Sequence, residues 1–203
     1  MRTDVITIFG TGDGISEALA ETEKAAVYCG LEPKQALRLR LLAEEMTGML
    51  RTIVTGGDYR YWIESKGKMF SLHLATDVRV GKEAYNELVK SSSSGKNDAA
   101  KGFMGRIRDV VLKLRDSSGA ILPTEYGYAY VEAGGCDPEM IYTSAAMFEG
   151  WSMKAYREKV EAHKQESPEE WDELERSIMA NLADEVKVFI RGNSVELEVD
   201  KNF

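Results

Sequence analysis

Residues 186–199 read VKVFIRGNSVELEV, and this stretch decides the fold class. Apolar side chains occupy every second position on both sides of a glycine–asparagine pair: Val186, Val188 and Ile190 before it, and Val195, Leu197 and Val199 after it. A period of two is typical of a strand with one buried face, and a short Gly/Asn connection is typical of a tight antiparallel turn. The C-terminus is therefore predicted to be a β-hairpin with one face in the core.

A second hairpin is predicted earlier in the chain, from two extended runs at Tyr59–Glu64 and Met69–Thr76. The four residues Ser65-Lys66-Gly67-Lys68 have the composition of a connection between them. In the second run Phe70, Leu72 and Leu74 alternate with Ser71, His73 and Ala75. This alternation indicates a half-buried antiparallel strand, with His73 on its solvent side.

Helical segments surround these hairpins. A short strand at Asp4–Phe9 runs into a glycine turn and a helix over Ile15–Gly30, and Pro33 opens a second helix that extends to about Thr55. A further helix is predicted near Gly102–Leu114, and Ser167-Pro168-Glu169-Glu170 is a capping box that requires a helix after it. The predicted fold class is α+β, a two-layer sandwich with helices on one face of a mixed, largely antiparallel sheet.

Composition limits the function classes. The 203 residues are 43% hydrophobic and carry a net charge of −8, which fits a globular protein and argues against a protein that binds nucleic acid through phosphate neutralisation. No run approaches the ~20 apolar residues of a membrane helix, and two distant cysteines fit a reducing, cytoplasmic location. The two histidines, His73 and His163, have no second histidine or cysteine at ligand spacing, so no transition-metal site is predicted.

Three local sequences are notable for their positions on the predicted helices and strands. They are Leu42-Ala-Glu44-Glu45-Met-Thr-Gly48 within the second helix, Asp77-Val-Arg-Val-Gly81 directly after a strand, and Lys101-Gly102-Phe103-Met104 leading into a helix. With this order the chain resembles the GHKL (Bergerat-fold) ATPases, and within them the ATP-binding domains of anti-sigma factor serine kinases and histidine kinases. The resemblance implies a regulatory ATP-binding protein.

The resemblance assigns Glu44 the role of a catalytic glutamate that activates water or a hydroxyl. In the family an asparagine four residues later, on the same helical face, holds Mg²⁺. Here that position is Gly48, which has no ligand atom, so no metal-binding residue is predicted. Loss of a metal ligand impairs phosphoryl transfer, and at most a weak serine kinase or ATPase activity is expected. From the helix alone, Glu44 can equally be a solvated residue paired with Arg40.

The other two motifs provide the expected nucleotide contacts. The resemblance implies that Asp77 accepts a hydrogen bond from the adenine amino group and that Gly81 completes the same box, although Arg79 replaces the middle glycine. From the sequence alone, Asp77 can equally be a turn residue that caps its own backbone.

Phosphate contacts are expected from Lys101 and Gly102, at a helix N-terminus, and from Lys96, in the serine-rich segment 91–98 that corresponds to the family's ATP lid.

The resemblance covers residues 1–115 and 184–203, which form the predicted GHKL-type domain. Residues 116–183 are expected to be a largely helical insertion. The family implies a protein partner, such as a sigma-like regulator, and dimerisation through apolar helix faces. The alternative is a nucleotide-free interaction module of the same fold that presents the insertion to a partner. A third, weaker alternative is an enzyme of unrelated chemistry with its site in the insertion.

Overall fold

The structure is a computed structural model that describes residues 1–53, 57–77, 120–124, 127–131, 151–164, 168–191 and 194–203. Its elements, in chain order, are β1 (Ile6–Ile8), α1 (Ile15–Tyr28), α2 (Pro33–Ile53), β2 (Tyr59–Lys66), β3 (Met69–Asp77), β4 (Ala120–Thr124), β5 (Gly127–Val131), β6 (Trp151–Ser152), α6 (Met153–Ala162), α7 (Pro168–Arg176), α8 (Ile178–Leu182), β7 (Glu185–Arg191) and β8 (Ser194–Asn202).

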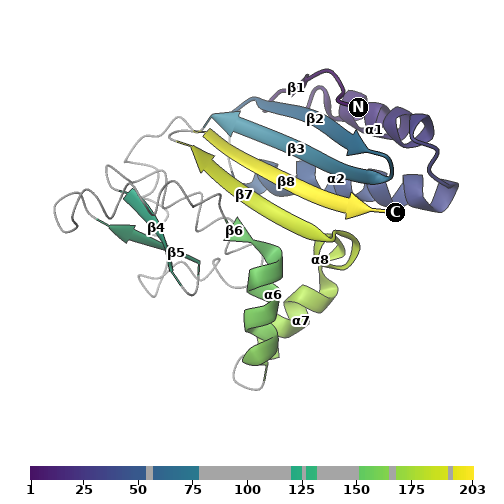
Figure 1. The fold of residues 1–203 in the computed structure, drawn as a ribbon. Coiled ribbons are helices and arrows are strands. Elements are labelled where there is room, and N and C mark those ends of the chain that lie inside the picture. The colour runs from purple at the N-terminus through teal and green to yellow at the C-terminus, as the bar shows by residue number, and fades with distance from the viewer. Residues whose placement is uncertain (54–56, 78–119, 125–126, 132–150, 165–167, 192–193) are drawn as a thin grey trace.

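Six of these strands form one sheet in the order β1-β2-β3-β8-β7-β6, and every pairing in it is antiparallel. Figure 1 shows α1 and α2 on one side of this sheet. The predicted α+β class, a two-layer arrangement with helices on one face, is confirmed. The sheet is antiparallel throughout its described pairings, whereas the expectation allowed a mixed one.

At the centre of the sheet, the C-terminal strand pairs with a strand from the first half of the chain. β8 lies beside β3 and pairs with it from Met69↔Asn202 to Asp77↔Ser194. The C-terminal hairpin β7–β8 is present as predicted, and its strands occupy the middle of the sheet rather than an edge. The N-terminal and C-terminal segments therefore share one core.

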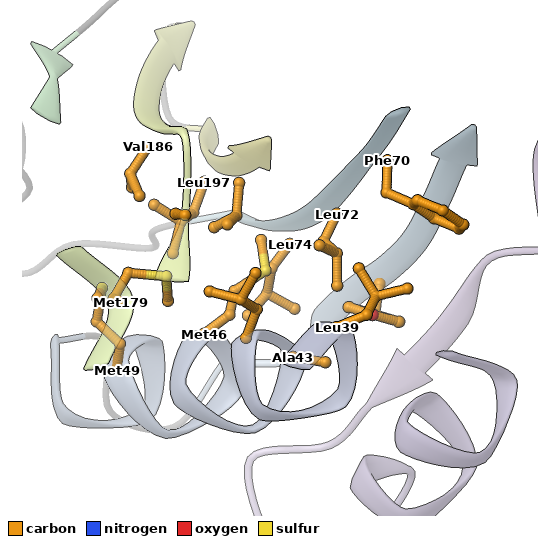
Figure 2. Close-up of a cluster of buried hydrophobic side chains, with 14 of the residues drawn as sticks. Leu39, Ala43, Met46, Met49, Phe70, Leu72, Leu74, Met179, Val186 and Leu197 are labelled. Carbon is orange, nitrogen blue, oxygen red and sulfur yellow. The ribbon is translucent and has the colours of Figure 1, made fainter. Parts of the chain in front are cut away.

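Strand alternation separates the sheet into two faces of different chemistry. The inner face, toward α1 and α2, carries buried apolar side chains, including Tyr61, Leu72, Leu74, Val186, Leu197 and Val199. Residues at the intervening positions lie on the outer face, away from these helices. Figure 2 shows how Leu39, Ala43 and Met46 of α2 pack against the inner face.

Local sequence explains the start of the first helix and the first hairpin turn. Gly14 precedes α1 at φ 93°, and a Cβ there would lie 2.3 Å from the carbonyl oxygen of Thr7, so only glycine fits. The β2–β3 connection has two residues, Gly67 and Lys68, rather than the four predicted, because pairing continues to Lys66↔Met69. Gly67 has φ 64°, as a tight two-residue turn requires.

Residues 151–182 include α6, α7 and α8, together with β6, which pairs with β7. The predicted capping box is followed by α7. Met153, Val160, Leu174 and Met179 belong to the same buried cluster as the sheet, so this part of the expected insertion packs on the common core. The helix predicted near residues 102–114 lies outside the described residues.

Candidate functional site

Glu44 lies in the middle of α2 with an exposed side chain. Its carboxylate is 3.8 Å from Arg40, and Arg40 also donates a short hydrogen bond to Glu23 of α1. Glu44 therefore belongs to an exposed ion-pair cluster on the helix layer. This agrees with the alternative interpretation, a solvated residue paired with Arg40. Its catalytic role stays a prediction.

Gly48 lies one turn further along α2, also at an exposed position. A Cβ placed at Gly48 meets nothing within 4 Å. The helix therefore has room for a larger residue beside Glu44.

Asp77 is the last residue of β3. This agrees with the prediction that its motif follows directly at the end of a strand. Arg60 of β2 donates two hydrogen bonds to its carboxylate, at 2.9 and 3.4 Å. The hydrogen bond to Asp77 raises the pKa of the Arg60 guanidinium. Both residues lie on the outer face, because they alternate with the buried residues of their strands.

The structure does not bring the two described candidates together. Glu44 lies on the helix layer and Asp77 on the opposite face of the sheet. The remaining candidates, Gly81, Lys96, Lys101 and Gly102, lie outside the described residues, so their nucleotide contacts stay predictions. Arg79 also lies there.

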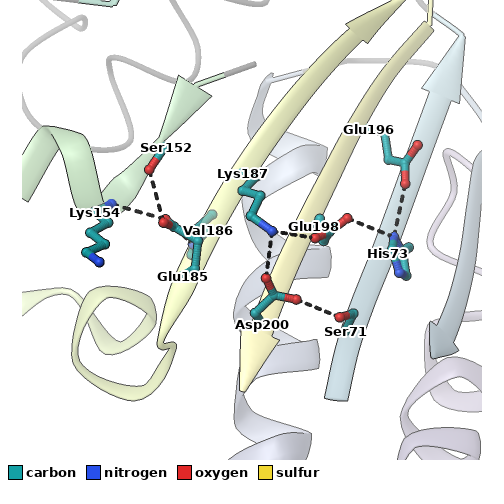
Figure 3. A network of polar contacts seen from close by, with 10 residues as sticks. All are labelled: Ser71, His73, Ser152, Lys154, Glu185, Val186, Lys187, Glu196, Glu198 and Asp200. Atoms are coloured by element: carbon teal, nitrogen blue, oxygen red, sulfur yellow. Dashed lines mark hydrogen bonds and ion pairs between the residues drawn. The ribbon is translucent and has the colours of Figure 1, made fainter. Parts of the chain in front are cut away.

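The outer face carries a network of polar side chains at its centre that sequence reasoning did not find (Figure 3). Backbone register places Trp62, His73, Glu198 and Lys187 in one row across four strands. Neighbouring rows add Glu196 on one side, and Ser71 and Asp200 on the other. The network therefore spans β2, β3, β8 and β7.

Histidine is the most deeply buried member of this network. His73 is 7% exposed, although it lies on the side of β3 predicted to face solvent. The prediction of exposure is wrong because Trp62 covers the imidazole, with the two rings parallel and their centroids 4.8 Å apart. A sequence pattern identifies the face of a strand but not what a neighbouring strand places over it.

Carboxylates surround one edge of the imidazole. Nδ1 of His73 is 3.0 Å from Oε1 of Glu196 and 3.7 Å from Oε2 of Glu198. The three ligand-type atoms that these residues offer all lie within 4.8 Å of one another. Such a set, one imidazole nitrogen and two carboxylate oxygens, can share a proton or bind a cation.

Lys187 completes the network on β7. Its Nζ donates to Oε1 of Glu198 at 2.9 Å and to Oδ2 of Asp200 at 2.8 Å. Partial burial lowers the pKa of Lys187, but its hydrogen bonds to Asp200 and Glu198 outweigh this effect and raise the pKa above the ordinary value. Lys187 therefore stays charged and holds one oxygen of Glu198, while the other oxygen is directed toward His73.

A comparison with protein-family models and one with curated proteins each gave no match to this chain. None of the helices in the described ranges combines the length and the apolar composition that crossing a membrane requires.

Proposed function

We propose that the protein is a degenerate GHKL-type ATP-binding regulatory protein that acts through a protein partner. The observation that carries this proposal is the placement of the motif residues along the chain: Glu44 lies within α2, and Asp77 ends β3. β3 is the strand to which the C-terminal hairpin pairs. These two positions, within a helix and at a strand end, support the resemblance.

Impaired catalysis is part of the proposal. Gly48 supplies no side chain for Mg²⁺, and Arg40 already engages Glu44. Phosphoryl transfer depends on metal neutralisation of the charge that develops in the transition state. ATP would then act as a ligand that changes partner binding, rather than as an efficiently used substrate.

The partner is a protein regulator, for example a sigma-like one, and the location is the cytoplasm. The net charge of −8 supports a function without nucleic acid. Formation of a homodimer through apolar helix faces belongs to the same proposal.

The second candidate is a nucleotide-free interaction module of the same fold. The Arg60–Asp77 pair favours it, because the carboxylate that would accept the adenine amino group already accepts two hydrogen bonds from Arg60. Asp77 also lies on the face of the sheet away from α2. This candidate predicts that nucleotide has no effect on stability.

The experiment that separates these candidates is thermal unfolding of the full chain with and without millimolar ATP or ADP, in the presence and absence of Mg²⁺. A ligand at 100 times its dissociation constant stabilises the folded state by about 2.7 kcal/mol. For a chain of this length, that stabilisation raises Tm by about 5–10 °C. Wild type is expected to show this shift, and Asp77→Ala is expected to lose it.

Arg60→Met is the matched control, because it breaks the same ion pair and leaves the carboxylate of Asp77 in place. If Asp77 binds adenine, Arg60→Met keeps or increases the ATP shift. If Asp77→Ala and Arg60→Met lose it equally, the nucleotide effect needs the intact ion pair, and the carboxylate of Asp77 is not itself the nucleotide ligand. No shift in wild type with any nucleotide would support the second candidate.

Gly48→Asn tests the missing metal ligand directly, since a side chain at position 48 has open space. If ATP binds beside α2, the amide should make the ATP shift depend on Mg²⁺. An ATP shift that stays independent of Mg²⁺ in Gly48→Asn would contradict the role assigned to this helix.

A further inference from the structure

The cluster of His73, Glu196 and Glu198 has the composition of a metal site and lies on the face of the sheet away from Glu44. Glu196 and Glu198 are two residues apart on β8, so both side chains lie on its outer face. His73 lies directly across from Glu198 on β3. A rigid pair of central strands therefore positions all three side chains.

Distances within the cluster are close to those of a coordination sphere. Nitrogen and oxygen ligands lie about 2.0–2.2 Å from Zn²⁺, so two ligands of a tetrahedral ion are about 3.3–3.6 Å apart. Nδ1 of His73 lies 3.0 Å from Glu196 and 3.7 Å from Glu198, on either side of this value. The three ligand atoms all lie within 4.8 Å of one another.

Carboxylates gather around this point. Glu196, Glu198 and Asp200 lie around His73 and Lys187, and the ammonium group of Lys187 binds Glu198 and Asp200 (Figure 3). Arg60 is the next cation, and Glu196 contributes to its raised pKa, but its hydrogen bonds go to Asp77.

Burial makes the imidazole a prepared ligand. His73 is 7% exposed, and its Nε2 has no hydrogen-bond partner among the described residues. The polar contacts of the ring are therefore those of Nδ1, which is directed at the carboxylates. Trp62 stacks on the ring and fixes its plane, and Lys187 holds the far oxygen of Glu198. Side chains held by packing and by such a hydrogen bond lose little freedom when they bind an ion.

We propose that His73, Glu196 and Glu198 bind a divalent transition-metal ion of the Zn²⁺ type on the outer face of the sheet. Each residue supplies one ligand atom: Nδ1 of His73 and one carboxylate oxygen of each glutamate. Three protein ligands leave a fourth position for water or a further group. Of the proposed nucleotide residues, Glu44 belongs to the helix layer, whereas Asp77 lies on this same outer face, at the end of β3.

The test is a titration of the metal-free full chain with Zn²⁺ by isothermal titration calorimetry. Wild type is expected to bind one ion per chain at this site. His73→Asn is expected to weaken binding by at least about 100-fold, more than the 10–100-fold typical of losing a group that only orients a ligand. His163→Asn is the matched control, since His163 is the other histidine of the chain and is exposed at the end of α6.

A double variant, Glu196→Gln with Glu198→Gln, keeps side-chain size and removes both anionic ligands. It is expected to weaken Zn²⁺ binding as strongly as His73→Asn does. Co²⁺ in place of Zn²⁺ reports the ligand type, and spectra without thiolate charge-transfer bands are expected because Cys29 and Cys136 take no part.

Nitrogen-15 NMR of the histidine rings in wild type tests the site even if a variant fails to fold. Zn²⁺ should shift the Nδ1 resonance of His73 and leave that of His163 unchanged. The proposal is overturned if Zn²⁺ does not bind wild type, if His73→Asn and His163→Asn bind it equally well, or if the His73 resonances do not respond.

Discussion

Leu197→Ala tests the register of the central strands, on which both proposals depend. Leu197 is 1% exposed and lies on the inner face between Leu74 of β3 and Val188 of β7. Truncation of a buried leucine to alanine costs about 2–5 kcal/mol, and the cost increases where neighbours cannot close the cavity. Paired strands on both sides and α2 beneath limit that closure (Figure 2), so we expect a loss of about 3 kcal/mol.

The assay is urea unfolding followed by circular dichroism, with a thermal melt in which the loss corresponds to a Tm lower by about 6–12 °C. Leu37→Ala is the control, because it makes the same chemical change at a side chain of α2 that is 58% exposed. Its stability should change by less than about 0.5 kcal/mol. A one-residue slip of β8 would move Leu197 to the outer face and bring Glu196 and Glu198 inside. A loss below about 1 kcal/mol for Leu197→Ala, or equal losses in the two variants, would refute the register.

Three further predictions concern other positions. Gly14→Ala should destabilise the fold by more than about 1 kcal/mol, because position 14 has a positive φ and the new Cβ would meet the carbonyl oxygen of Thr7. Urea unfolding measures this loss, and an unchanged unfolding midpoint would contradict the backbone conformation described at the start of α1. Gly48→Ala should instead stabilise α2 by about 0.5–1 kcal/mol, since alanine is the better helix former and the site is open; a lower Tm would count against this. Burial raises the pKa of Tyr61, so its contribution to stability is complete below pH 10 and decreases as pH rises further, because only the unfolded chain ionises there. Tyr61→Phe should therefore lose less stability than wild type between pH 10 and about 11, and parallel pH profiles would argue against a buried phenol.

The candidate site could be predicted only in part. Sequence spacing placed Glu44 within a helix and Asp77 at a strand end, and both positions agree with the structure. The ion pairs of these two residues differ in whether the sequence could predict them. Arg40 is four residues from Glu44 on the same helix, so helical spacing alone predicted that pair. Arg60 meets Asp77 only through the pairing of β2 with β3.

The outer-face network lay beyond sequence reasoning for a related reason. Alternation in β8 shows that Glu196 and Glu198 share a face opposite Leu197, and this signal is present in the sequence. It does not show that β8 pairs with β3, more than a hundred residues earlier in the chain. That pairing places His73 beside the two glutamates and Trp62 over His73.

The sequence by itself determined the local structure: which segments form helices and strands, which face of each strand is buried, and where glycine turns end them. These features follow from periodicity and backbone preference over short stretches, so a single chain segment specifies them. Tertiary structure decided the strand order, the burial of His73 and its position beside the glutamates of β8. Contacts between segments distant in sequence are set by how the apolar faces pack together, and that packing is a property of the whole core.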